Sequence, residues 1–209
     1  MTHVVRRRLF AVVPAAGTSR RMGRPKLLLP LGNATAISTM LAALARQEIA
    51  ATVVIVRSDD EPLRAAVAES GATPLQPETP PPEMRDSVEY GLRYLTQHFQ
   101  PQPDDGWLLI PADHPLLEPA VMDQVIAAWQ ASPEKIIIPV YQKKRGHPTV
   151  FPFRLAPDVF ALAANEGLNS LLARRADEIE PIEVASFSVV ADLDTPDDYA
   201  RLKAEFERR

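Results

Sequence analysis

Uninterrupted apolar runs recur along the chain, and they restrict its fold more than any other feature. Residues 9–13, 52–56 and 107–110 read LFAVV, TVVIV and WLLI. Strands buried on both faces have this pattern, whereas strands with one solvated face alternate apolar and polar residues. Between the runs, apolar residues recur at helical spacing, as Ile37, Met40, Leu41 and Leu44 do. Such alternation predicts an α/β three-layer sandwich, with a mostly parallel sheet and helices on both faces.

The expected elements follow from the same patterns and from turn and cap residues. We expect strands at residues 9–13, 52–56, 72–75, 107–110, 135–140, 149–151 and 187–190. We expect helices at residues 34–47, 85–99, 118–131 and 169–175. A further helix is expected to begin after a cap at Ser58 or Asp59 and to end at residue 69. A last helix is expected from residue 196 to the C-terminus, after Asp194 or Thr195. The proline-rich segment 76–82 is expected to be a stiff loop. No internal repeat or domain boundary is evident, so residues 1–209 are predicted to form a single domain.

Composition narrows the class of protein. The 209 residues are 46% hydrophobic and 24% charged, as is ordinary for a globular protein. The net charge of −4 gives no reason to expect nucleic-acid binding. The absence of cysteine excludes disulfides, thiol nucleophiles and cysteine-bound metals. The first residues lack the apolar run of a signal peptide, and no apolar stretch reaches membrane-spanning length. We therefore expect a cytoplasmic enzyme or binding protein.

The stretch between residues 12 and 30 carries the strongest chemical signal. It follows the first predicted strand and reads VVPAAGTSRRMGRPKLLLP. Small residues let a backbone approach a ligand closely, and free N–H groups beside cations form a concave anion site. The spacing matches neither the Walker loop nor G-x-G-x-x-G. A plain solvated basic turn is the alternative, but such a turn does not need glycine, hydroxyl residues and a Pro-Lys step together. The pattern therefore predicts a triphosphate-binding loop with an exposed lysine at position 26.

Two acidic turns are candidates for a metal site. Asp113 follows the buried run 107–110 in the sequence PADHP. Asp192 and Asp194 lie on the same side of an extended segment near the last helix. Mg²⁺ is commonly held by one or two carboxylates together with substrate phosphates. Asp194 could also be an ordinary helix start, so both readings stay open for that residue.

The opening stretch resembles the signature loop of the MobA-like nucleotidyltransferases, most closely the molybdopterin cytidylyltransferase branch. The resemblance is carried by A-A-G-x-S-R-R-M-G-x-P-K-L-L-L-P and spans nearly the whole chain. It implies a Rossmann-like fold of the nucleotide-diphospho-sugar transferase type. It implies catalytic roles for Arg21, Lys26 and Asp113. The nucleotide-binding residues that it implies are Ala15, Ala16, Gly17, Thr18, Ser19, Arg20, Arg21, Gly23, Lys26 and Ser87.

Further motifs extend this resemblance. P-A-D-x-P-L-L and D-x-D-T-P-x-D-Y are similar to the family's acidic motifs, and they imply that Asp113 and Asp194 hold Mg²⁺, with Asp192 as the second choice. Gly-His-Pro at residues 146–148 resembles a motif of the acceptor half, which implies that His147 positions the acceptor. Glu83, Arg85 and Asp86 depart from the corresponding family segment, although Ser87 and Gly91-Leu92 match, and residues 166–172 match their segment only in part.

The resemblance also implies a reaction. A nucleoside monophosphate would pass from CTP to the phosphate of molybdenum cofactor, with release of pyrophosphate. The N-terminal half would bind nucleotide and the C-terminal half the acceptor, and a molybdoenzyme or its chaperone would be a partner. Guanylyl relatives carry glycine where this chain has Ala16, which favours CTP. The alternatives are GTP as donor, a sugar phosphate or another small acceptor, or a binding protein without turnover.

Overall fold

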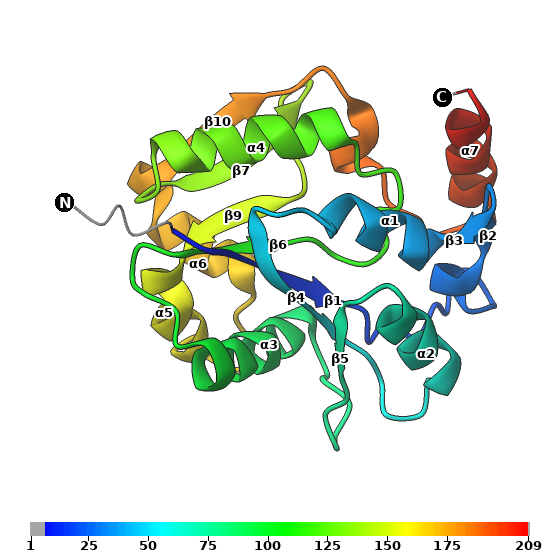
Figure 1. Ribbon diagram of the computed structural model, residues 1–209, viewed down its shortest axis with the longest axis horizontal. Helices are drawn as coiled ribbons and strands as arrows, with labels where there is room; N and C mark the ends of the chain where they lie inside the picture. Colours follow the sequence, from blue (N-terminus) through cyan, green and yellow to red (C-terminus); the bar gives the residue numbers. More distant parts are fainter. Residues whose placement is uncertain (1–6, 209) are drawn as a thin grey trace.

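The computed structural model describes residues 7–208, and one continuous sheet runs through it (Figure 1). The strand order is β10-β7-β9-β6-β1-β4-β5, and β8 pairs with β7 at the side. Parallel pairs join β1 to β4 and β6, β4 to β5, and β10 to β7, whereas β9 is antiparallel to β6 and β7. The strands are β1 Leu9–Pro14, β4 Ile49–Ile55, β5 Thr73–Leu75, β6 Gly106–Leu109, β7 Ile136–Tyr141, β8 Lys144–Arg145, β9 Thr149–Pro152 and β10 Ile179–Glu183. The sheet is therefore mostly parallel, as the sequence predicts.

Alternate residues of β1 divide the core into two layers. Leu9, Ala11 and Val13 pack in one cluster with residues of α1 Ala36–Leu44, α2 Glu61–Glu69 and α4 Pro119–Ala131. Phe10 and Val12 pack in a second cluster with α3 Met84–Phe99, α5 Ala156–Phe160 and α6 Leu168–Arg174. Figure 1 shows α1 and α4 on one side of the sheet and α3, α5 and α6 on the other. This arrangement confirms the predicted three-layer α/β sandwich.

A third cluster holds the last helix against the segment after the opening loop. α7 Pro196–Glu207 packs Leu202 with Met22, Leu29, Leu31 and Leu193. Leu31 belongs to a small second sheet of β2 Pro30–Leu31 and β3 Ala34–Thr35, which follows the short helix η1 Lys26–Leu28. Tyr199 of α7 also donates its hydroxyl to the carbonyl of Pro30 at 2.6 Å. The C-terminal segment is thereby fixed beside the residues that follow β1 (Figure 1).

Three predicted elements are wrong or incomplete. The run 187–190 is the 3₁₀ helix η4 Phe187–Val190, because the Ser186 hydroxyl accepts the N–H of Ser188 and closes a tight turn. The last sheet strand is β10 instead, which the sequence hid because IEPIE lacks an uninterrupted apolar run and contains proline, a residue confined to sheet edges. Helix α1 is shorter than residues 34–47, because residues 34–35 pair with β2. The cap of α2 is Asp60, which accepts the N–H of Leu63 at 3.2 Å, and is neither Ser58 nor Asp59.

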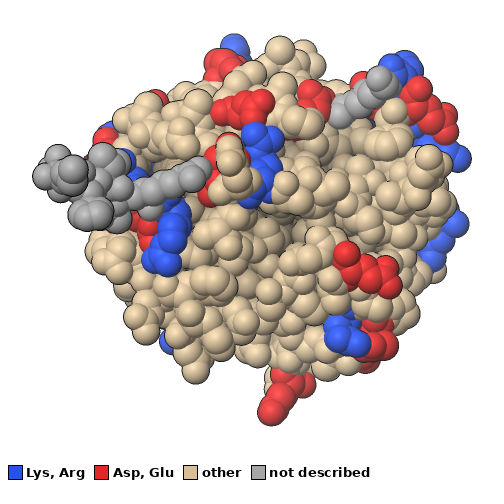
Figure 2. Space-filling model, viewed as in Figure 1, with Lys and Arg blue, Asp and Glu red and all other residues tan. Residues whose placement is uncertain are grey.

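The structure also adds α5 and the short helices η2 Phe153–Leu155 and η3 Ala176–Glu178, which the sequence patterns did not indicate. None of the helices within residues 7–208 is both long and apolar enough to cross a membrane. On the face shown in Figure 2, acidic and basic side chains are interspersed. The prediction about a signal peptide concerns in part residues 1–6, which lie outside the described residues.

Candidate functional site

The opening loop leaves the carboxyl end of β1 between its two neighbouring strands. The N–H of Ala15 donates to the carbonyl of Ile55 at 2.9 Å, and the N–H of Ala112 donates to the carbonyl of Pro14 at 3.0 Å. The loop then closes on itself, because the N–H of Gly23 donates to the carbonyl of Ser19 at 3.1 Å. Gly23 has φ +69° and Ser19 φ +51°, so the turn uses two left-handed residues. The loop backbone is thus shaped by its own turns.

Lys26 lies between two carboxylates from distant parts of the chain. Its Nζ donates to Asp113 Oδ2 and to Asp194 Oδ1, each at 2.8 Å. Arg21 Nη2 donates to Asp194 Oδ2 at 2.7 Å. The structure therefore brings together Arg21, Lys26, Asp113 and Asp194 in one cluster of two cations and two anions. The expectation of an exposed lysine is wrong, since the Lys26 side chain is only 12% exposed.

The contacts of the cluster shift the pKa values of Lys26 and Asp194 in opposite directions. Burial acts to lower the pKa of Lys26, but Asp113 and Asp194 outweigh it and hold that pKa above its ordinary value. Burial likewise acts to raise the pKa of Asp194, and Lys26 and Arg21 outweigh it and hold that pKa below its ordinary value. Both shifts favour the charged forms of Lys26 and Asp194 near neutral pH.

The backbone joins the two acidic turns. The N–H of Leu193 donates to the carbonyl of Asp113 at 2.8 Å, so the segment before α7 runs beside the turn after β6. The cap of α7 is Thr195, whose hydroxyl accepts the N–H of Asp198, while Asp198 Oδ2 accepts the N–H of Thr195. Asp194 is therefore not the cap of α7, because its carboxylate contacts Lys26 and Arg21 instead. Asp192 follows η4, and it is not a partner of either cation.

A metal site at these carboxylates is chemically consistent with the residues present. Within residues 7–208 no group of three or more His, Cys, Asp or Glu side chains is arranged to hold a metal ion. Asp113 and Asp194 nevertheless direct one oxygen each to a single cationic group, the ammonium of Lys26. Two carboxylates with open positions suit Mg²⁺ or Mn²⁺, which take further oxygens from phosphates and water. The donor set fits such a cation when a polyphosphate is bound with it.

Two cavities meet along the opening loop. A cavity of about 200 Å³ is bordered by Ala15, Ala16, Gly17, Lys26, Ser87 and Asp113, together with residues of the proline-rich segment. On the other side of the loop, a shallow hollow of about 570 Å³ is bordered by Gly17, Thr18, Ser19, Arg20, Gly23 and Arg24, and by Arg57, Asp59, Asp60 and Pro62. The predicted nucleotide-binding residues are thus divided between the two hollows, and Gly17 borders both. The exception is Arg21, which lines neither hollow and contacts Asp194.

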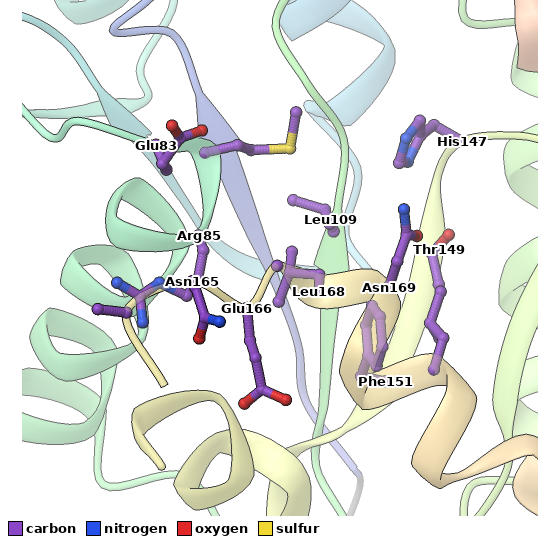
Figure 3. Close-up of a pocket in the computed structure, with 14 residues that line it drawn as sticks. Glu83, Arg85, Leu109, His147, Thr149, Phe151, Asn165, Glu166, Leu168 and Asn169 are labelled. Atoms are coloured by element: carbon purple, nitrogen blue, oxygen red, sulfur yellow. The ribbon is translucent and has the colours of Figure 1, made fainter. Parts of the chain in front are cut away.

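A third cavity, of about 530 Å³, contains His147 (Figure 3). Its wall includes Phe151 and Leu168, and the polar side chains around it include Glu83, Asn165, Glu166 and Asn169. Glu83 and Met84, at the start of α3, also border the cavity of about 200 Å³. The cavity with His147 therefore adjoins the cavity of about 200 Å³ at the amino end of α3.

His147 is fixed at the cavity wall by its backbone. Its N–H donates to the carbonyl of Val189 at 2.8 Å, and the preceding Gly146 packs so closely that a Cβ would lie 2.3 Å from the same carbonyl oxygen. Burial, helped by the neighbouring His114 ring, lowers the pKa of His147 to about 4. His147 is therefore a neutral imidazole near pH 7, able to donate or accept one hydrogen bond but not to act as a cation.

The sequence reasoning missed two residues near this wall. His114 stood at a variable position of the motif, yet its ring is buried, lies 5.0 Å from the His147 ring centre, and has Nε2 3.9 Å from Asp113 Oδ1. Arg85 was noted only as a departure, and its guanidinium donates to the carbonyls of Leu162 and Ala163, each at 3.1 Å. No local pattern predicts either contact, because both depend on how distant segments pack.

Comparison with known proteins agrees with this geometry. A family model described as MobA-like NTP transferase domain matches residues 11–179. The purine catabolism protein PucB of Bacillus subtilis (strain 168) is 27% identical over 199 residues, covering 91% of this chain and 94% of PucB. The crystal structure of Rv0371c from Mycobacterium tuberculosis H37Rv is similar, with a TM-score of 0.78, 25% identity, and 95% and 98% coverage of the two chains. A manganese complex of Rv0371c matches with a TM-score of 0.72 and 24% identity, covering 94% of this chain and 98% of that one.

Proposed function

Because the chain belongs to the MobA-like NTP transferase family, we propose that it transfers cytidine monophosphate from CTP to the phosphate of molybdenum cofactor and releases pyrophosphate. The observation that carries the proposal is the cluster of Lys26, Asp113 and Asp194 where the loop cavity ends. In this assignment the N-terminal half binds the nucleotide and the C-terminal half binds the acceptor. The product would pass to a molybdoenzyme or its chaperone.

The reaction needs charge neutralisation more than proton transfer. An acceptor phosphate oxygen forms a bond to the α-phosphorus, and the bond between the α-phosphorus and the bridging oxygen breaks, so the electron pair leaves with pyrophosphate. A terminal phosphate is already an anion near pH 7, since its second pKa is about 6, so no general base is required. Lys26 and Arg21 are assigned to the phosphates, where preorganised cations stabilise the transition state.

Asp113 and Asp194 are assigned to a divalent cation, with Asp192 as the second choice. The cation, when bound, supplies positive charge to the triphosphate oxygens. The manganese complex of Rv0371c favours such a cation, and Mg²⁺ is the expected one in the cell. Asp113 and Asp194 would hold the cation, and the ammonium of Lys26 would donate to a phosphate oxygen in place of one of its two carboxylates.

His147 is assigned to acceptor positioning. It lines the cavity of about 530 Å³ that adjoins the nucleotide space at Glu83 and Met84. As a neutral imidazole it can form a directed hydrogen bond without attracting phosphate by charge. This property suits the neutral body of an acceptor better than its phosphate.

The donor and acceptor are tested by pyrophosphate release with CTP, GTP, ATP and UTP, each with and without molybdenum cofactor. We expect release only with cofactor, and a higher kcat/KM for CTP than for GTP, because Ala16 borders the nucleotide cavity where guanylyl relatives carry glycine. Asp113→Asn serves as the inactive control. A preference for GTP would contradict the CTP assignment, turnover only with a sugar phosphate would replace the acceptor, and binding without turnover would make this protein a nucleotide-binding protein.

A further inference from the structure

The shallow hollow on the outer side of the opening loop includes a cation that the sequence did not single out. Besides the loop residues, it is bordered by Arg57, Asp59, Asp60 and Pro62, which lie between β4 and α2. We propose that this hollow receives the pyrophosphate end of the nucleoside triphosphate, and that Arg57 binds it there. The inference rests on the proposed function, because it assigns a place to the leaving group of that reaction.

The size of the nucleotide cavity is the first argument. The cavity beside Lys26 and Asp113 has a volume of about 200 Å³. Sites that enclose drug-sized ligands have volumes of about 300–1,000 Å³. A nucleoside triphosphate is larger than this cavity can enclose, so part of it must extend into a neighbouring space. The cavity adjoins one neighbour at Glu83 and Met84 and the other at Gly17.

The charges of these two neighbours differ. The cavity with His147 is bordered by Glu83 and by Glu166, whose carboxylate is paired with Arg174, a residue that does not line the cavity (Figure 3). Its cation is Arg85, whose guanidinium is already engaged by two backbone carbonyls and by Asp86. The outer hollow is bordered by Arg20, Arg24 and Arg57, and within the described chain neither Arg20 nor Arg24 forms an ion pair. A polyphosphate is therefore favoured in the outer hollow and disfavoured beside His147.

Arg57 is oriented before any ligand arrives. Its Nε donates to Asp59 Oδ1 at 2.7 Å and its Nη2 pairs with Asp59 Oδ2, so Nη1 is not engaged by this carboxylate. Its carbonyl accepts the N–H of Asp60 at 3.2 Å and the side-chain amide of Gln76 at 3.1 Å, which fixes the backbone. Asp59 and Asp60 place two formal negative charges against the three arginines, so the hollow keeps an excess of positive charge.

The order of the three spaces also suits the chemistry. In an in-line displacement the attacking oxygen and the leaving oxygen lie on opposite sides of the phosphorus. An acceptor entering past Glu83 and Met84 would approach from one neighbour, and pyrophosphate would leave past Gly17 into the other. The electron pair of the broken bond leaves with pyrophosphate, whose added negative charge Arg20, Arg24 and Arg57 would neutralise.

The test compares Arg57→Gln with Arg64→Gln. Arg64 lies on α2, pairs with Glu61 and does not border the hollow, so its substitution removes the same charge from the same region. Binding of inorganic pyrophosphate in the presence of Mg²⁺ is measured by calorimetry, alongside its inhibition of turnover. For Arg57→Gln we expect pyrophosphate affinity to fall by about tenfold, as for loss of one hydrogen bond to a charged group, with inhibition by cytidine monophosphate unchanged.

The two proposals fail in different ways. Equal pyrophosphate affinity in Arg57→Gln and in the unaltered protein, with both folded by circular dichroism, overturns the role of Arg57. A similar loss in Arg64→Gln overturns it too, because the effect would then be one of long-range charge. If pyrophosphate binding depends on Arg57 but no nucleoside triphosphate is turned over, the site stands and the proposed transferase reaction is wrong.

Discussion

At the scale of single residues, the ammonium of Lys26 balances two carboxylates that would otherwise repel each other. Asp113 and Asp194 both hold this one group at 2.8 Å, and the Lys26 side chain is largely buried. We therefore expect a divalent cation to compete with Lys26 for these two carboxylates. In the absence of nucleotide, the two carboxylates are expected to bind Lys26 rather than Mg²⁺. Lys26 is part of the chain, whereas Mg²⁺ must first lose bound water.

We predict that Lys26→Met reduces turnover by about two to three orders of magnitude, as removal of a preorganised charge typically does. In metal-free buffer the melting temperature should fall, because two partly buried carboxylates lose their counter-ion. Adding Mn²⁺ should raise the melting temperature of the variant more than that of the unaltered protein. Scanning calorimetry with and without Mn²⁺ measures both effects.

The matched control is Arg20→Met, which removes a charge from the same loop without touching either carboxylate. Its response to Mn²⁺ should equal that of the unaltered protein. An equal Mn²⁺ response in Lys26→Met would show that lysine and metal do not compete.

Local signals explain which site residues the sequence could indicate. Lys26 and Asp113 each follow a buried strand with small residues around them, so their place at the sheet edge was predictable. Arg57 also follows a strand, but a lone arginine in a polar turn gives no signal by itself. The partial burial of Lys26 depends on Asp194, far along the chain, and no local pattern reports that contact.

At the scale of elements, the amino end of α7 assigns helix capping and contact with Lys26 to different residues, which the sequence alone could not separate. Thr195 and Asp198 satisfy each other's backbone N–H groups, so the cap is complete without Asp194. The elements also show which parts of the sheet the sequence patterns could not predict. The buried strands β1, β4 and β6 were predictable from their composition, whereas the edge strand β10 was not, because it pairs only with β7.

Substitutions at these neighbouring positions should therefore have opposite effects. Thr195→Ala is expected to lower the free energy of unfolding by about 1 kcal/mol, as loss of an N-cap does, and to retain turnover. Asp194→Asn is expected to abolish metal-dependent turnover with a smaller change in stability. Urea denaturation and pyrophosphate release measure the two properties. Should Asp194→Asn lower only stability and leave activity intact, the metal pair would have to be reassigned to Asp113 and Asp192.

At the scale of the whole molecule, the opening loop is attached to the C-terminal helix through the third core cluster. Met22 is a buried residue of the loop, and it packs in that cluster with Leu29, Leu193 and Leu202. The loop is therefore anchored on one side by the sheet and on the other by α7. Packing that positions Met22 also positions its neighbours Arg21 and Gly23, so we expect the packing of α7 to affect the proposed nucleotide binding.

We predict that Leu202→Ala raises the KM for the nucleoside triphosphate although Leu202 lines none of the three cavities. The substitution should cost about 2–5 kcal/mol of unfolding free energy, because Leu202 is almost fully buried and leaves a cavity. Ile126→Ala, in the first cluster on α4, is the control for a similar loss of core volume remote from α7. Denaturation and steady-state kinetics on both variants separate the effects, since a general loss of stability would raise KM equally in both, whereas an anchored loop predicts a rise only in Leu202→Ala.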